Sequence, residues 1–111
     1  MTNNNYTLPE ISFIGGTTQY LTYSVFDQNG NPVDLNGATC KVKFRQYGSF
    51  GGSAILDKTG NITGLNNFQI VLDTSDTKDL YGKFVQQAIV IDSGKKEFRY
   101  QGIIVIEKAI L

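Results

Sequence analysis

Apolar and polar residues alternate along much of this chain with a period of two. The clearest case covers residues 38–45, where an apolar set alternates with a polar set: Ala38, Cys40, Val42 and Phe44 against Thr39, Lys41, Lys43 and Arg45. Successive side chains of a β-strand point to opposite faces of its sheet, so this period is typical of a strand. The pattern therefore predicts a strand with one buried face and one basic, solvated face.

The same alternation predicts further strands, and helical periodicity is almost absent. The predicted strands cover residues 11–14, 21–26, 68–72, 84–91 and 98–106, with a weaker one at 54–58. One short helical turn is predicted over Thr74–Leu80, where Ser75 can cap the first turn and Asp76 suits the positive end of a helix. Because no second catalytic group accompanies them, we interpret Asp73, Asp76 and Asp79 as the solvated start of this helix.

Short turn signals separate the predicted strands. Asn29-Gly30 and Asn36-Gly37 supply the positive φ angles that tight turns require, and Thr59-Gly60-Asn61 and Ser93-Gly94-Lys95 repeat the signal. Short strands at this spacing are typical of an antiparallel sandwich or barrel. We therefore expect an all-β fold of roughly six to eight strands with one short helical turn.

Two of the predicted strands are apolar on both faces. The strands at 84–91 and 98–106 place aliphatic side chains at both even and odd positions. The outer face of a sandwich meets water and is usually polar, and fully burying an aliphatic side chain contributes about 1.5–3 kcal/mol. We therefore expect a cover, from residues 74–81, from the N-terminal arm or from another subunit, and the sequence leaves these alternatives open. The candidate interface residues are Val85, Ile89, Ile91, Ile104 and Ile106.

Length, charge and targeting signals limit the class of protein. A chain of 111 residues fits one domain, which we place at residues 11–111 after a flexible N-terminal arm at 1–10. Ten basic residues balance ten acidic ones, so no net field attracts nucleic acid or an anionic membrane. The N-terminus has no signal-peptide pattern, and the longest apolar run, Ile103–Ile106, is far too short to cross a bilayer.

The residue types limit the chemistry. The chain has no histidine and one cysteine, Cys40, which sits in an alternating apolar set and is expected to be buried. This removes histidine-based catalysis, tetrahedral Cys/His zinc sites and internal disulfides. Residues 27–34 resemble a calcium loop, but Pro32 stands where the loop needs glycine, so a hairpin turn is favoured. We expect no enzymatic activity, no cofactor and no metal site.

Two surface features are candidates for binding. The glycine-rich residues 48–53 lack the Lys-Ser/Thr and the following helix of a phosphate loop, so we interpret them as a loop between strands. Tyr47 and Phe50 in and beside this loop are candidate contacts for a partner, including a glycan. A basic strand face with aromatic residues can bind single-stranded nucleic acid, but zero net charge favours a solubilising role for these cations: Lys41, Lys43, Arg45, Lys83, Lys95 and Lys96.

The order of these pieces is more specific than any one of them. It runs from Asn29-Gly30-Asn31-Pro32-Val33-Asp34-Leu35-Asn36-Gly37-Ala38-Thr39 through Val42, Phe44, Gly64 and the strand at 68–72 to Asp76-Thr77, Leu80, Gly82-Lys83-Phe84, Asp92 and a final strand after Gly102. Over residues 20–108 this order resembles the N-terminal immunoglobulin-like domain of the baseplate upper proteins of tailed phages that infect Gram-positive bacteria. Asn36 and Phe84 depart from the pattern, at positions where a hydroxyl residue and a tyrosine are expected.

The resemblance implies an antiparallel immunoglobulin-like β-sandwich that docks on a phage tail or baseplate. It lends no catalytic residues. The expected partners are virion proteins or further copies of the chain, and the expected location is the virion, after synthesis in the host cytoplasm. The alternative is an immunoglobulin-like binding module that recognises a host cell-surface glycan through the loop aromatics Tyr47 and Phe50.

Overall fold

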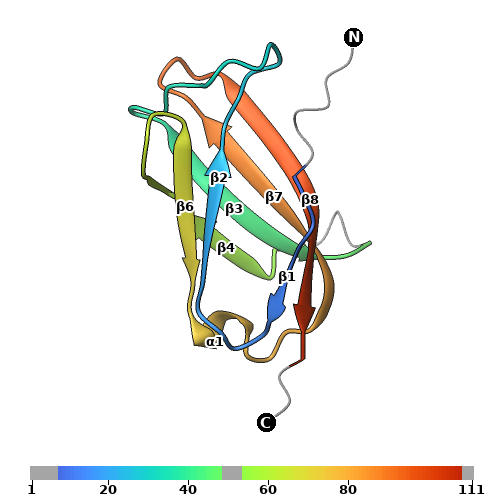
Figure 1. Ribbon diagram of the computed structural model, residues 1–111. Coiled ribbons are helices and arrows are strands. Elements are labelled where there is room, and N and C mark those ends of the chain that lie inside the picture. The colour runs from blue at the N-terminus through green and yellow to red at the C-terminus, as the bar shows by residue number, and fades with distance from the viewer. Residues whose placement is uncertain (1–7, 49–53, 109–111) are drawn as a thin grey trace.

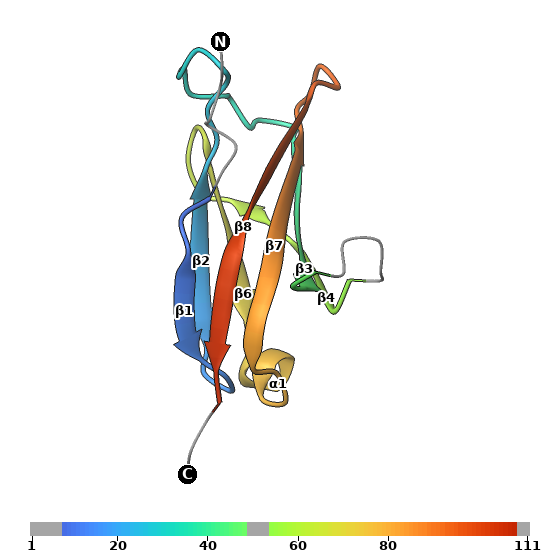
Figure 2. The same ribbon diagram turned by 90° about the vertical axis from the view of Figure 1, so that its right-hand side faces the viewer.

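The computed structural model describes residues 8–48 and 54–108, which form two β-sheets packed face to face (Figures 1 and 2). The strands are β1 (Ile11–Ile14), β2 (Gln19–Ser24), β3 (Thr39–Gln46), β4 (Leu56–Thr59), β5 (Asn61–Ile62), β6 (Asn67–Leu72), β7 (Gly82–Ile91) and β8 (Glu97–Glu107). One short helix, α1 (Thr74–Thr77), lies between β6 and β7 at one end of the sandwich. The prediction of an all-β sandwich with one helical turn is confirmed, and the two separate sheets exclude a barrel.

The strand order differs from an entirely antiparallel arrangement at one edge. One sheet has the order β1-β8-β7-β3-β4 and the other the order β2-β6-β5. Neighbouring strands are antiparallel except β1 and β8, which run parallel with Ile11 opposite Ile104. The chain passes from β1 to β2 in the other sheet, so β1 has no hairpin partner in its own sheet and lies beside the last strand of the chain.

The core lies between the sheets and is built by the alternation that the sequence shows. The fully or almost fully buried side chains include Leu21, Val25, Leu35, Cys40, Val42, Phe44, Phe68, Ile70, Leu72, Val90, Ile104 and Ile106. The Tyr23 ring stacks on Phe68 with 4.9 Å between ring centroids. Cys40 is buried as predicted, and burial raises the pKa of its thiol, which makes the reactive thiolate scarce.

The predicted turn at Asn29-Gly30 is confirmed. Gly30 has a φ of 84°, and Phe26 and Pro32 form an isolated bridge across the turn. The Asp27 carboxylate accepts hydrogen bonds from the backbone N–H groups of Asn29 and Asn31, both at 2.9 Å. Asp27 therefore closes a turn, which is the interpretation favoured over a calcium loop.

At Gly60 the structure differs from the predicted turn. The chain does not fold back within one sheet but passes from β4 in the larger sheet to β5 in the smaller one. The Gly60 N–H donates to the Cys40 carbonyl at 2.8 Å, which draws the backbone into the core. A Cβ atom at Gly60 would lie 2.4 Å from Phe68 Cδ2, so this glycine serves a close approach of the backbone to an aromatic ring.

The helix is shorter than predicted and is capped by a different residue. The N-cap is Asp73 rather than Ser75, and the Asp76 carboxylate accepts a hydrogen bond from the Asp73 N–H at 2.7 Å. The same carboxylate oxygen lies 2.7 Å from Lys58 Nζ on β4. Asp76 thus links the helix to the edge of the larger sheet, and it has a structural role in the fold.

Replacing Asp76 with asparagine is expected to lower the free energy of unfolding by about 1 kcal/mol at neutral pH, because it removes the ion pair and the charged acceptor at the helix start. Burial by itself raises the pKa of the Asp76 carboxyl, but the hydrogen bonds from Lys58 and Asp73 and the Lys58 charge lower it below its ordinary value of 3.8. A lowered folded-state pKa stabilises the fold above pH 3.8, and this stabilisation is lost as the pH falls through the folded-state value.

Urea unfolding at neutral pH and at a series of acid pH values checks this prediction. The difference between the wild type and Asp76→Asn should shrink in acid. Asp79→Asn, at an exposed residue just after the helix, is the control and should behave as the wild type throughout. A difference for Asp76→Asn that stays constant with pH would contradict the role of the ion pair.

Candidate functional site

The outer face of the larger sheet carries a row of aliphatic side chains. On β7 and β8 the inward positions include Phe84, Ala88 and Val90 on the first strand and Ile104 and Ile106 on the second. The alternate positions therefore point outward. We call the outward aliphatic residues the outer stripe, and they are Val85, Ile89, Ile91, Ile103 and Val105.

The structure corrects the grouping of the candidate interface residues. Ile104 and Ile106 are 0% and 1% exposed and pack in the core, so these two do not lie on the outer face. Val85, Ile89 and Ile91 do lie on that face, together with Ile103 and Val105, which the sequence did not single out. Both faces of β8 are aliphatic near its end, so the alternation has no contrast there that could tell the inner face from the outer one.

The outer stripe is partly covered by polar side chains of its own sheet. Ile89 lies opposite Lys41 on β3 and opposite Arg99 on β8. Long cationic side chains lay their aliphatic stems along apolar neighbours and keep their charge in water, which accounts for the half-buried state of Ile89. Two internal covers were predicted, namely residues 74–81 and the N-terminal arm. In the structure α1, from the first of these segments, closes one end of the sandwich, and Leu8, from the second, packs against the core.

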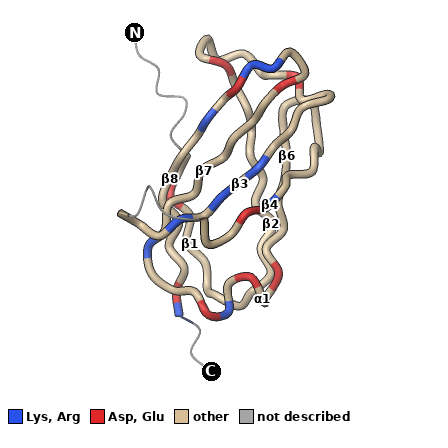
Figure 3. The backbone as a smooth tube through the Cα atoms, turned by 180° about the vertical axis from the view of Figure 1, so that it is seen from behind, with Lys and Arg blue, Asp and Glu red and all other residues tan. Residues whose placement is uncertain are grey.

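Cations follow β3 beside the outer stripe. Figure 3, which views this sheet from outside, shows them along the strand. Lys41 lies 3.8 Å from Asp57, and Arg45 Nε donates to Gln87 Oε1 at 2.7 Å. Lys95 and Lys96 lie instead on the turn between β7 and β8. The face that results has an aliphatic centre and a cationic border.

The two loop aromatics have different outcomes. Phe50 lies outside the described residues. Tyr47 is 51% exposed, and Lys83 Nζ lies 4.9 Å from the centroid of its ring. Tyr47 also lines a hollow of about 190 Å³ with the outer-stripe residues Val85 and Ile103 and with Gln101 and Gly102. Tyr47 therefore borders the outer stripe.

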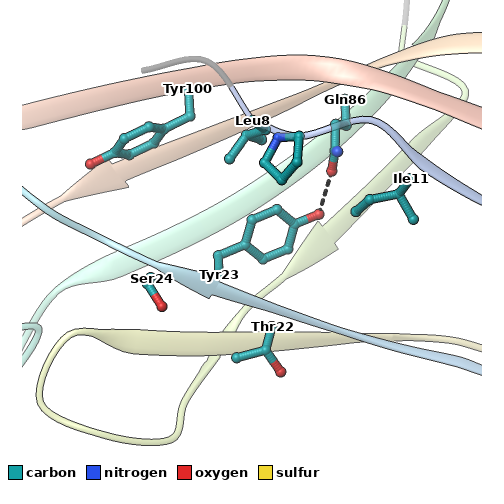
Figure 4. Close-up of a pocket in the computed structure, with 8 residues that line it drawn as sticks. Leu8, Ile11, Thr22, Tyr23, Ser24, Gln86 and Tyr100 are labelled. Atoms are coloured by element: carbon teal, nitrogen blue, oxygen red, sulfur yellow. Dashed lines mark hydrogen bonds between the residues drawn. The ribbon is translucent and has the colours of Figure 1, made fainter. Parts of the chain in front are cut away.

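A second and larger hollow lies between β2 and the segment that leads into β1 (Figure 4). It has a volume of about 300 Å³ and is lined by Leu8, Pro9, Ile11, Thr22, Tyr23, Ser24, Gln86 and Tyr100. The Tyr23 hydroxyl donates a hydrogen bond of 2.6 Å to Gln86 Oε1. Burial raises the pKa of Tyr23, so the phenol keeps its proton and acts as the donor in this bond.

Gln86 is the polar residue that sequence reasoning passed over. It occupies an inward position of β7 and is 0% exposed. Its Nε2 atom is buried and has no hydrogen-bond partner among the described residues. The available signal was a carboxamide in the row of inward positions between Phe84 and Ala88. Its partner Tyr23 is far away along the chain, so only the packing of β2 over β7 brings the two together.

Metal and membrane chemistry find no support in the described part of the chain. Residues 8–48 and 54–108 contain no group of three or more His, Cys, Asp or Glu side chains that could hold a metal ion. None of the helices in these residues is long and apolar enough to cross a membrane.

No family model matches the sequence, and no curated protein matches it.

Proposed function

We propose that the protein is a non-enzymatic structural component of a phage or prophage tail or baseplate. In this proposal it assembles through the outer stripe with a second copy or with a neighbouring virion protein. The observation that carries the proposal is the set of five aliphatic side chains on the outer face of β7 and β8, in two groups that Gln87 and Gln101 separate. An outer sheet face is usually polar, and exposed aliphatic side chains gathered on such a face often mark an interface between proteins.

The strand order supports the expected class of sandwich. Immunoglobulin-like domains place strands B, E and D in one sheet opposite G, F and C in the other. The order β2-β6-β5 opposite β8-β7-β3 agrees with that arrangement. Of the motifs that carry the resemblance, Asn29-Gly30 forms a turn, Asp76-Thr77 lies in α1 and Gly82 begins β7.

The composition of this face suits assembly with a partner of complementary charge. The aliphatic centre supplies apolar area whose burial stabilises a complex by about 25 cal/mol per Å² before the costs of association. The cations of β3 at its border would orient a partner that carries carboxylates, because charges at the rim contribute mainly specificity and association rate. Val85 is already buried, and binding would complete the burial of the other four residues of the outer stripe, which are half-buried.

Size-exclusion chromatography with light scattering, over a tenfold range of protein concentration, tests the proposal. The wild type is expected to form a discrete oligomer or to bind a purified neighbouring tail protein, and Ile89→Lys is expected to abolish that association. Ile62→Lys is the matched control, because Ile62 is 43% exposed on β5 of the other sheet. A wild-type chain that stays monomeric and ignores tail proteins, or an Ile89→Lys variant that associates normally, would overturn the proposal.

The second candidate function is an immunoglobulin-like module that binds a cell-surface glycan through loop aromatics. One observation favours it, which is that the half-exposed Tyr47 borders a hollow of about 190 Å³. This candidate requires a glycan to contact the Tyr47 end of the outer face. It predicts a monomer whose glycan-induced changes are centred on Tyr47.

A further inference from the structure

One inward position of β8 beside Gln86 has no side chain, and the segment before β1 packs into the space this leaves. Gly102 lies opposite Gln86, and a Cβ atom there would lie 2.7 Å from Leu8 Cβ and 2.8 Å from the Leu8 carbonyl oxygen. The Leu8 N–H donates to the Gln101 carbonyl at 2.8 Å, which holds this segment against β8. Leu8 and Pro9 therefore form one wall of the hollow, and β2 forms the wall opposite.

The carboxamide of Gln86 is left half satisfied in this position. Its oxygen accepts from the Tyr23 hydroxyl, while its Nε2 has no partner among the described residues. Leaving a buried donor unpaired is costly, and methionine of nearly the same size would avoid that cost. Gln86 lines the hollow, so a small rotation of its carboxamide would present this unpaired donor to an acceptor that enters the hollow.

The walls define the chemistry of that acceptor. None of the eight lining residues is charged, so an ionic ligand would lose its hydration without gaining a counter-charge. Apolar surface comes from the side chains of Leu8, Pro9 and Ile11 and from the rings of Tyr23 and Tyr100. The faces of aromatic rings attract weakly positive C–H groups. The ligand that fits is neutral and has both an apolar face and oxygen atoms.

The edge of β2 adds backbone hydrogen-bonding groups. β2 is an edge strand of its sheet, and the Val25 N–H donates to the Asn66 carbonyl on the β6 side. In an antiparallel pair the direction of the backbone groups alternates, so those of Thr22 and Ser24 point away from β6 towards the hollow. β1 runs beside one end of β2, and Ile11 lines the hollow there, which favours a compact ring over an extended peptide (Figures 1 and 4).

We propose that this hollow is a binding site for a neutral, hydroxylated ring of monosaccharide size, one of whose oxygens accepts a hydrogen bond from Gln86 Nε2. Its volume of about 300 Å³ is at the small end of the range for ligand pockets, which suits one sugar ring. Thr22 and Ser24 supply backbone donors and acceptors for the remaining hydroxyls. This site is separate from the outer stripe and does not rest on the proposed function.

The test is an NMR titration of the isotope-labelled protein with single neutral sugars, namely glucose, galactose, N-acetylglucosamine and rhamnose. At least one sugar is expected to shift the side-chain amide signals of Gln86 and the backbone signals of Leu8, Ile11 and Thr22 in a saturable manner. Gln86→Met is expected to weaken that binding about five- to tenfold, the value of one lost hydrogen bond. The matched control is Gln87→Met, which changes the same residue type at the next, outward position of β7.

A second variant keeps the test decisive if Gln86→Met fails to fold. Ile11→Phe adds volume to the wall of the hollow and is expected to block sugar binding while the sandwich remains folded. Each of four results would overturn the proposal: no saturable shift with any sugar, shifts that survive both variants, shifts centred on Tyr47, or a crystal soaked in sugar that holds water alone in the hollow. Binding of an extended peptide along β2 in place of a sugar would also overturn it.

Discussion

Replacing Ile104 with alanine is expected to lower the free energy of unfolding by about 4 kcal/mol, because it leaves a cavity between the two sheets. Ile104 is 0% exposed and lies between Phe84 on β7 and Ile11 on β1 in the register of the larger sheet. All three side chains belong to the core or pack against it, so the surrounding structure has little freedom to close over the lost methyl groups.

The matched control is Ile103→Ala, one position earlier on the same strand. Ile103 points outward in the outer stripe and is already partly exposed, so its truncation should cost about 1 kcal/mol. Urea unfolding of the two variants measures the difference directly. A larger loss at Ile103 would show that β8 presents the opposite face to the core, and equal losses would show that both faces are buried to the same degree. Either result would remove Ile103 from the outer stripe.

Replacing Gly60 with alanine is expected to lower the free energy of unfolding by about 3 kcal/mol, through overpacking at the crossover from β4 to β5. The added methyl group would lie 2.4 Å from Phe68 Cδ2 and 3.1 Å from Cys40 Cβ. Phe68 is fully buried and its ring is stacked on Tyr23, so it has no open space to move into. The backbone or the ring must shift, and either shift disturbs the packing of both sheets.

Thermal and urea unfolding check this prediction, with Gly94→Ala as the control. A Cβ atom at Gly94 would meet only Asp92 Oδ1, at an ordinary 3.5 Å, so that variant should stay within about 0.5 kcal/mol of the wild type. Phe68→Val removes the atoms that clash, so combining it with Gly60→Ala should cost clearly less than the sum of the two single changes. Strict additivity would show that the cost at Gly60 does not come from the Phe68 ring.

The two proposed surfaces can be tested independently because they lie on different parts of the sandwich. The outer stripe covers the outside of the larger sheet, while the hollow beside Gln86 opens between β2 and the segment before β1. A partner docked on the outer stripe would leave the hollow open. Ile89→Lys should therefore abolish assembly without changing sugar binding, and Gln86→Met should do the reverse.

Much of the fold could be predicted from local patterns. The alternation over residues 38–45 correctly identified β3 and its buried face, because each side chain of a half-buried strand reports its own environment. The Asn29-Gly30 turn was predictable for a similar reason, since the conformation of a tight turn depends on its own residues. The candidate site was less predictable, because it depends on which faces and strands meet.

The failures fall where local pattern carries no contrast or where the partner is distant. Ile104 was grouped with Ile89 because both faces of β8 are aliphatic, and the sequence could not show which face turns inward. Gly60 was interpreted as part of a turn, since a glycine that permits close approach and a glycine that bends the chain look alike in sequence. The helix cap is Asp73 rather than Ser75, and Asp73 and Asp76 form a capping box at the helix start.

The sequence by itself determined the class of fold, most of the strands, the burial of Cys40 and the presence of aliphatic residues on both faces of the last two strands. Each of these features follows from the period and the type of neighbouring residues. The tertiary structure decided which of those faces is the core, that β1 runs parallel to β8, and that Tyr23 meets Gln86 beside a hollow. These features depend on contacts between residues far apart along the chain, where the packing of one sheet against the other selects among arrangements that the local pattern allows equally.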